Sequence, residues 1–228
     1  MALANNPLLD FSDLPLFDQI EPDHIAPALD VLLAQADSAF ETVVAPDFPA
    51  TWAALSSTLD TALERLGRAW GAVGHLNSVA DTPELRAAYN EALPRVTEFY
   101  TRLGSDERLY AKYKAIDPAS LNPQQRKARE NAMRDFVLGG AELAETEKAR
   151  FAQIQERLAE LTQKFSENVM DATDQWHHYT TRAEAAGVPD DVLQAASQLA
   201  LADAERDGAT LQPDSVKFTL KIPSYLPV

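Results

Sequence analysis

Apolar residues recur at steps of three and four along most of this chain, which is the period of an amphipathic helix. The stretch from Trp52 to Val73 keeps this spacing over about six turns. Proline and glycine interrupt the pattern and divide it into separate segments. The expected helices cover residues 21–44, 49–79, 82–103, 106–115, 122–171 and 189–207, with Gly139–Gly140 as a candidate break in the fifth.

Local signals support the ends of these helices. Pro22 suits the first helical position, and Thr82 and Asn122 are cap residues that each precede a proline. Gly208 is a typical residue for ending the last helix. These signals agree with the apolar period, so we expect the helix boundaries to fall near them.

Two further patterns predict how the helices pack. Glycine costs about 1 kcal/mol relative to alanine inside a helix, so a glycine row predicts close helix–helix approach, with a bend as the alternative. That row is Gly67, Gly71 and Gly74. A coiled-coil-like seam lies in the fifth helix, and we expect it to pack within a helical domain rather than as a free coiled coil. The seam residues are Phe151, Ile154, Leu158, Leu161 and Phe165.

The period changes to two near the end of the sequence. From Val216 to Ile222 apolar and polar residues alternate, which is typical of a half-buried strand. A strand needs a partner for its backbone groups, and residues 176–182, rich in aromatic and β-branched side chains, are the expected partner. The predicted fold class is mainly α, a multi-helix domain of antiparallel helices with a small two-stranded β element near the C-terminus.

These elements suggest three regions. Residues 1–20 form an extended segment whose apolar residues pack it on the domain. Residues 21–172 form the helical domain, and residues 173–228 form a strand–helix–strand tail. A two-stranded sheet is only marginally stable by itself, so we expect this tail to be part of a larger fold.

Composition excludes several classes of function. The formal net charge is −15, and no Lys or Arg precedes Arg65, so the surface repels nucleic acid and anionic membranes. No stretch approaches the roughly 20 apolar residues of a membrane span, and residues 1–11 do not resemble a secretory signal. The chain has no cysteine, which rules out disulfides and thiolate metal sites. We expect a cytoplasmic protein without nucleic-acid or membrane partners.

Histidines are the first candidates for chemistry, and none predicts a site. His177 and His178 are adjacent on a predicted strand and so point to opposite faces, which disfavours a shared metal. His75 follows a glycine-rich apolar stretch and is expected to be a hydrogen-bonded structural residue. His24 lies in the first turn of a helix and is expected to face solvent.

Other polar and aromatic groups favour structural roles as well. Acidic residues group at Glu142, Glu145 and Glu147 and at Asp190 and Asp191, where solvated faces are the simpler interpretation than acid–base catalysis. The short basic run Arg126, Lys127 and Arg129 is followed by Glu130 and does not argue for nucleic acid. Four aromatic residues at helical spacing favour core packing over the lining of a peptide channel: Tyr89, Phe99, Tyr100 and Tyr113.

Several segments in order along the chain resemble the N-terminal part of the thimet oligopeptidase family of zinc metallopeptidases. They span the chain from end to end, and their specificity lies in the combination. The segments are Asn6–Leu9, Leu14–Ile25, His75–Val79, Thr82–Asn90, Leu93–Pro94, Leu121–Phe136, Phe165–Thr173 and Pro223–Val228.

That resemblance implies a mostly helical enzyme with a deep channel, in which zinc hydrolyses short peptides. Its zinc is held by His-Glu-x-x-His plus a downstream Glu, and the Glu of the motif acts as general base. This sequence has no two histidines separated by four, so it lacks the motif. We expect no catalytic, cofactor-binding or metal residues here, no zinc bound by this chain, and no activity of the chain alone.

The resemblance also sets the expected role and partners. The chain would form a wall or lid of the channel, and its tail would lead toward a catalytic domain that the sequence does not contain. Short peptides and that catalytic domain would be the partners, and exposed apolar surface or the tail strand would promote self-association. The alternative is a stand-alone helical binding or scaffold protein with no enzymatic role. A coding sequence that continues past Val228 into His-Glu-x-x-His would decide between them.

Overall fold

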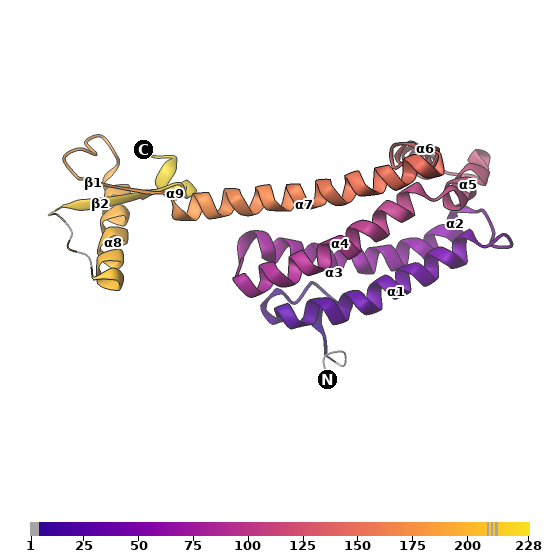
Figure 1. The fold of residues 1–228 in the computed structure, drawn as a ribbon, viewed down its shortest axis with the longest axis horizontal. Helices are drawn as coiled ribbons and strands as arrows, with labels where there is room; N and C mark the ends of the chain where they lie inside the picture. The colour runs from indigo at the N-terminus through magenta and orange to yellow at the C-terminus, as the bar shows by residue number, and fades with distance from the viewer. Residues whose placement is uncertain (1–4, 209, 211, 213) are drawn as a thin grey trace. The chain divides into compact units, whose positions relative to one another are not determined.

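The computed structural model describes residues 5–208, 210, 212 and 214–228. It confirms the predicted fold class, since the chain is mainly helical with one two-stranded antiparallel sheet near the C-terminus (Figure 1). The chain divides into two compact units, Met1–Glu160 and Leu161–Val228, which are described separately below. Among the described residues, no helix is long and apolar enough to cross a membrane.

Three long helices form the first core of the first unit. They are α1 (Ile25–Val44), α3 (Thr61–Val79) and α4 (Pro83–Ser105), which lie side by side in Figure 1. Their buried faces include Ile25, Leu32, Leu66, Val73 and Phe99. The apolar period therefore determines which face of each helix is buried.

A second core lies at the other end of α1. Phe40 and Val43 of α1 meet side chains from α2 (Trp52–Leu55), the π turn η4 (Ser56–Asp60), α5 (Glu107–Ala115) and α6 (Pro123–Leu138). The π turn interrupts the helix expected over residues 49–79, so that α2, η4 and α3 follow one another without a loop.

Side-chain caps begin the helices where the sequence predicts them. Thr82 Oγ1 accepts a hydrogen bond from the Leu85 amide at 3.2 Å, and Asn122 Oδ1 accepts one from the Gln125 amide at 2.8 Å. In turn, the Asn122 amide donates a hydrogen bond to the Gln125 side chain, which completes a capping box. A 3-10 turn, η5 (Pro118–Ser120), connects α5 to this box.

The segment before α1 forms three short 3-10 turns, η1 (Pro7–Leu9), η2 (Phe17–Gln19) and η3 (Pro22–His24). Leu8 is buried in the first core, whereas Leu14 is 79% exposed. The buried Asn6 donates to the His24 carbonyl at 2.8 Å and so ties the segment to the start of α1.

The second unit contains a two-stranded sheet with a helix packed on it, and this helix lies between the two strands in sequence. Strand β1 (His177–Thr181) pairs antiparallel with β2 (Ser215–Thr219), and His178 faces Phe218 across the register. Helix α8 (Asp190–Asp207) covers Val216 and Phe218 with Leu193 and Ala196. Gly208 follows α8 in the left-handed conformation, as expected for a helix end.

The terminal strand is shorter than its alternation predicts. It ends at Thr219, and Ile222 instead begins the short helix α9 (Ile222–Tyr225), where it is 69% exposed. The physical reason is local, because Thr219 donates its amide to the Ser224 hydroxyl and Pro223 favours a helix start. The partner strand lies within the range predicted for it.

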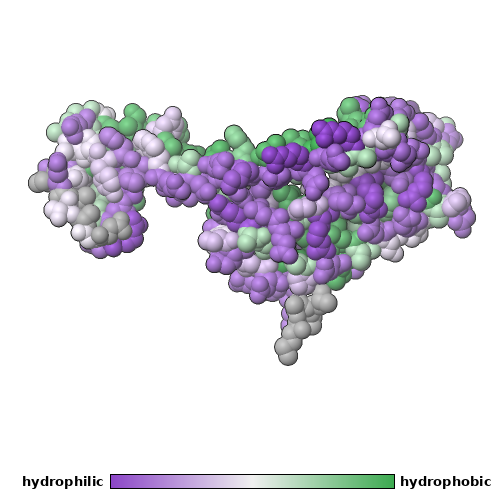
Figure 2. All heavy atoms as spheres, in the orientation of Figure 1, coloured by the Kyte–Doolittle hydropathy of each residue, from purple (hydrophilic) through white to green (hydrophobic). Residues whose placement is uncertain are grey.

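The packing predicted for the seam is wrong for four of its five residues, since only Phe151 is half-buried. The seam lies on α7 (Glu145–Gln175), which begins in the first unit and ends in the second. Ile154, Leu158, Leu161 and Phe165 are 47, 54, 49 and 69% exposed. Figure 2 shows apolar side chains gathered along this helix.

The glycine row on α3 makes fewer close contacts than predicted. A Cβ at Gly67 would meet only the Tyr100 hydroxyl at 3.8 Å, and one at Gly74 only the Tyr89 ring at 3.9 Å. A Cβ at Gly71 would meet nothing within 4 Å, so the prediction of close approach is wrong there. The tight glycine contact of the first unit lies instead at Gly139.

Candidate functional site

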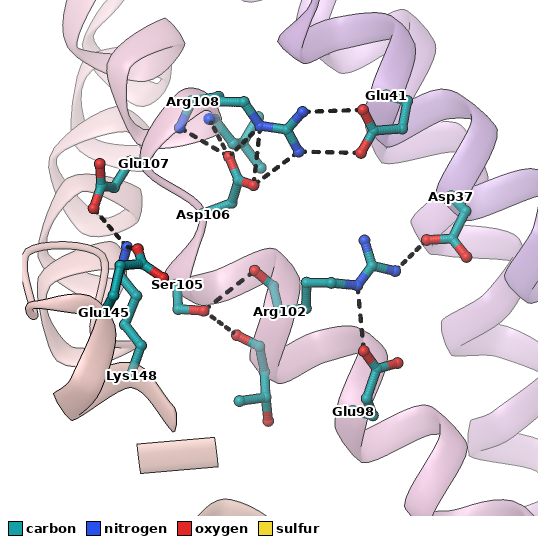
Figure 3. Close-up of polar contacts among 12 residues, drawn as sticks. Asp37, Glu41, Glu98, Arg102, Ser105, Asp106, Glu107, Arg108, Glu145 and Lys148 are labelled. Carbon is teal, nitrogen blue, oxygen red and sulfur yellow. Dashed lines mark hydrogen bonds and ion pairs between the residues drawn. The ribbon is translucent and has the colours of Figure 1, made fainter. Parts of the chain in front are cut away.

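A ladder of three ion pairs joins α1 to α4 and α5. Arg95 pairs with Asp30 at 2.6 Å, Arg102 pairs with Asp37, and Arg108 pairs with Glu41 at 3.0 Å. The last two pairs are drawn in Figure 3, where each guanidinium group points at a carboxylate of α1. We call these three pairs the ion-pair ladder.

The helical repeat aligns the ladder. Asp30 and Asp37 are seven residues apart on α1, and Arg95 and Arg102 are seven residues apart on α4, so each pair lies on one face of its helix. Arg108 reaches Glu41 from α5, and Asp106 holds it at 3.0 Å while also capping α5. The ladder is thus fixed by helix geometry and by one cap.

Beside the ladder lies a groove of about 880 Å³ formed by α1, α4 and the first part of α7. Part of its lining is apolar, and we call this part the floor: Leu33, Ala34, Pro94, Phe99 and Ala152. Its rim is charged, with four carboxylates and three cations: Asp30, Asp37, Glu98, Glu156, Arg95, Arg102 and Lys148. We call this feature the charged groove.

The cations of the groove are already engaged. Arg102 donates to Glu98 at 3.3 Å in addition to Asp37, and Lys148 donates to Glu107 at 2.6 Å and to Glu145 at 3.3 Å (Figure 3). Ser105 directs its hydroxyl back to the carbonyls of Thr101 and Arg102, so it is not a free nucleophile.

The electrostatics keep these groups charged. Burial lowers the pKa of Arg102, but its hydrogen bond to Asp37 and the charges of Asp37 and Glu98 outweigh burial, so this pKa lies above its usual value. The hydrogen bond to Glu107 raises the pKa of Lys148 in the same way. Groups held ionised in this way can bind a ligand but are poor proton donors near neutral pH.

A second groove, of about 540 Å³, has an aromatic lining from α3, α4 and α7. Trp70 stacks on Tyr89 with ring centroids 4.5 Å apart, and Tyr100 and Phe151 lie along the same groove. Gly104 and Gly139 complete its wall, where α4 meets the end of α6.

The aromatic candidates divide between core and surface. Phe99 is buried, as predicted, and Tyr89 and Tyr113 are half-buried. Tyr100 is 37% exposed and lines the aromatic groove, so its predicted core role is wrong. Burial, with the charge of Asp60, raises the pKa of Tyr113 to about 12.

The structure corrects the predicted roles of two of the four histidines. His24 is half-buried rather than solvent-facing, because its Nδ1 accepts the Glu21 amide at 3.0 Å in the cap of η3. His75 is exposed, its ring lies 5.3 Å from that of Phe17, and among the described residues its side chain makes no hydrogen bond. The predicted hydrogen-bonded role of His75 is therefore wrong. His177 contacts the Tyr179 ring two positions along β1.

The acidic groups are held in local contacts. Glu142 accepts from the Tyr110 hydroxyl at 2.8 Å, and this bond, followed by that from Lys114, lowers the pKa of Glu142. Glu145 pairs with Lys148, and Glu147 accepts the Ala144 amide at 3.1 Å at the start of α7. Asp190 and Asp191 are exposed in the first turn of α8. These contacts explain the clusters without catalysis.

The basic run has a structural use that the sequence does not reveal. Arg129 donates to the carbonyls of Tyr113 and Lys114, both at 2.9 Å, and so caps the end of α5. Arg126 donates to the Leu121 carbonyl at 3.3 Å, and Lys127 pairs with Glu130 at 3.5 Å. All three residues thus act within α5, α6 and their connection.

The charged residues of the groove were not singled out from the sequence. The available signal was the shared spacing of seven in Asp30/Asp37 and Arg95/Arg102. That spacing identifies a helix face but not its partner, since the paired residues lie 65 positions apart along the chain. Only packing of α1 against α4 brings them together.

Comparison with known proteins gives the family. The model described as "Neurolysin/Thimet oligopeptidase, N-terminal domain" matches residues 29–148, which is more than half of the chain. The chain belongs to the thimet oligopeptidase family. Within it, the chain is 42% identical over 230 residues to "Oligopeptidase A" of Haemophilus influenzae, covering 98% of this chain and 32% of that protein.

Two further thimet oligopeptidase relatives show the same coverage. "Oligopeptidase A" of Escherichia coli is 42% identical, covering 98% of this chain and 32% of that protein. "Probable cytosolic oligopeptidase A" of Arabidopsis thaliana is 36% identical, covering 99% of this chain and 33% of that protein. The chain therefore spans about a third of the length of these relatives and is the N-terminal domain of a peptidase family.

Membership of the thimet oligopeptidase family raises the question of zinc. Zinc in proteins needs three or four His, Cys, Asp or Glu side chains gathered within bonding distance. Within residues 5–208, 210, 212 and 214–228 no such group of three exists. The described residues therefore do not fit a zinc site.

Proposed function

We propose that this chain is the non-catalytic N-terminal helical region of an oligopeptidase A-like zinc metalloendopeptidase that hydrolyses short peptides in the cytoplasm. The observation that carries the proposal is the 42% identity over 98% of the chain to proteins named oligopeptidase A, of which the chain spans 32%. In this role the chain forms a wall or lid of the substrate channel, and the zinc belongs to the catalytic part.

The first unit has the rigidity that a wall requires. Two apolar cores and the ion-pair ladder fix α1, α3, α4 and α5 to one another. A rigid wall excludes folded proteins because admitting them would require these cores to separate, whereas short peptides fit without such a change. The two grooves give this wall concave surfaces for small ligands.

The exposed apolar residues of α7 support the proposal of a docking surface for another part of the enzyme. Soluble proteins rarely leave large apolar patches uncovered, and such patches mark interaction sites. Ile154, Leu158, Leu161 and Phe165 provide such a surface, and the proposed occupant is the catalytic part of the enzyme.

A chimera tests the role. The first third of the Escherichia coli relative is replaced by this chain, and cleavage of a quenched-fluorescent short peptide is compared with cleavage of a folded protein. We expect the chimera to cleave the short peptide, to lose this activity with a chelator, and to spare the folded protein. The chain alone is expected to cleave neither substrate.

The controls are the remaining two thirds of the relative without a graft and the intact relative. Chelator-sensitive cleavage by the purified chain alone would contradict the proposal that this chain is non-catalytic. Equal selectivity of the remaining two thirds with and without this chain would contradict the wall role. A chimera that stays folded by circular dichroism but lacks activity would also count against the proposal.

A further inference from the structure

The charged groove has spare capacity for a cation. Arg95, Arg102 and Lys148 are each held by at least one carboxylate. The carboxylate of Glu156, in contrast, makes no hydrogen bond or ion pair within the described part of the chain, and this side chain is exposed. The rim therefore offers a free negative charge but no free positive charge.

The floor of the groove suits the aliphatic part of a long side chain. Leu33, Ala34, Pro94, Phe99 and Ala152 line it, and the groove volume is about 880 Å³. Lysine and arginine commonly lay their methylene groups on apolar surface while the charged head stays in water or near an acid. Floor and rim together match the two halves of such a side chain.

We propose that the charged groove binds a lysine or arginine side chain of a peptide, with its methylenes on the apolar floor and its cationic head at Glu156. Peptides as the ligand class rest on the function proposed above. The net charge of −15 attracts cationic peptides from solution and raises their local concentration at the groove.

An anionic peptide group is disfavoured at the same place. It would have to displace Asp37 or Glu98 from Arg102, or Glu107 from Lys148. Each displacement leaves one carboxylate without its partner in an already acidic groove. The groove therefore discriminates by charge, and a neutral side chain of the same length gains only the floor contacts.

Fluorescence anisotropy with the 228-residue chain tests this inference. The probes are three labelled short peptides that differ only in a central lysine, norleucine or glutamate. The variants are Glu156→Gln, which removes the free charge, and Ala34→Phe, which fills the floor. Their matched controls are Glu160→Gln on α7 and Ala87→Phe on α4, since both control positions are exposed and neither lines the groove.

We expect the lysine peptide to bind most tightly and the glutamate peptide most weakly. Glu156→Gln should raise the dissociation constant for the lysine peptide about two- to fivefold, which is the range of an exposed ion pair, and leave norleucine binding unchanged. Ala34→Phe should weaken both peptides. The two control variants should bind as the unmodified chain does.

Three results would overturn the inference: no saturable binding of any probe, equal binding of the lysine and glutamate peptides, or groove variants that behave as their controls. This assay requires no cleavage and no catalytic part. An inactive chimera would therefore contradict the proposed function but not the binding of a cationic side chain in the groove. Conversely, an active chimera would not support the groove proposal if the peptides fail to bind.

Discussion

Gly139, at the end of α6, approaches Gly104 of α4 so closely that a Cβ on Gly139 would lie 2.7 Å from the Gly104 carbonyl oxygen. The φ of Gly139 is −76°, which any residue adopts. Glycine is therefore required by space rather than by backbone conformation. The contact fixes α6 against α4 at the wall of the aromatic groove.

Gly139→Ala should consequently destabilise the first unit. The clash is with backbone, so the helices must separate, at a cost of about 1–3 kcal/mol in the free energy of unfolding. Urea denaturation followed by circular dichroism measures this cost. Gly71→Ala is the matched control, because its Cβ meets nothing within 4 Å and should stabilise the helix by up to about 1 kcal/mol. Similar values for the two variants would contradict the steric argument.

The ion-pair ladder should contribute a salt-dependent stability. Asp37→Asn removes one partner of Arg102 while the guanidinium group keeps its place over the rings of Phe40 and Phe99, at 5.5 and 5.6 Å. Both side chains are partly exposed, so we expect a loss of about 0.2–1 kcal/mol at low salt.

Measuring the stability of the same variant at high salt is the control for that prediction. In molar salt the difference between Asp37→Asn and the unmodified chain should shrink, since screening acts within a few ångströms. Glu91→Gln, at an exposed position of α4 outside the groove, should change stability little at either ionic strength. A loss that is independent of salt would indicate a packing effect instead.

The sequence predicts the helices because their information is local. Apolar periods, the caps at Thr82 and Asn122 and the glycine at 208 each act within a few residues. The end of β2 escaped prediction because alternation continues to Ile222, whereas the Ser224 hydroxyl and Pro223 start a helix. The exposure of the α7 face was not predicted, because an apolar seam indicates that some surface covers it but does not identify that surface.

The candidate site was the least predictable part because its contacts are not local in sequence. The partners in the ladder are 65 or more positions apart, so no local rule joins Asp37 to Arg102. Arg129 likewise looks like part of a basic run, and only the packing of α6 beside α5 reveals that it caps carbonyls. Charged residues that serve tertiary contacts cannot be told from solvated ones by spacing.

The second unit should lose stability in strong acid through Asp203. A hydrogen bond from Lys217, then one from the Tyr179 hydroxyl, lowers the pKa of Asp203 from 3.8 to about 2. Because the folded state holds the proton less tightly, this stabilisation is fully present above pH 3.8 and is lost as the pH falls toward about 2. The network connects α8 to both strands.

Unfolding of Asp203→Asn across that range measures the effect. The variant should be less stable than the unmodified chain above pH 3.8, and the difference should vanish near pH 2. Asp190→Asn, at the exposed start of α8, is the control and should show no such convergence. A difference that stays constant with pH would mean that Asp203 acts through packing alone.

The exposed face of α7 should make the 228-residue chain self-associate. Leu158 and Phe165 are 54 and 69% exposed on one helix, and burying them against a second copy removes apolar area from water. We expect light scattering to show a mass that rises with concentration, and the double variant Leu158→Lys/Phe165→Lys to remain monomeric. Leu201→Lys, at a 58% exposed position of α8, is the control and should associate as the unmodified chain does. A monomer at high concentration, or equal loss of association in the control, would show that this face does not drive assembly.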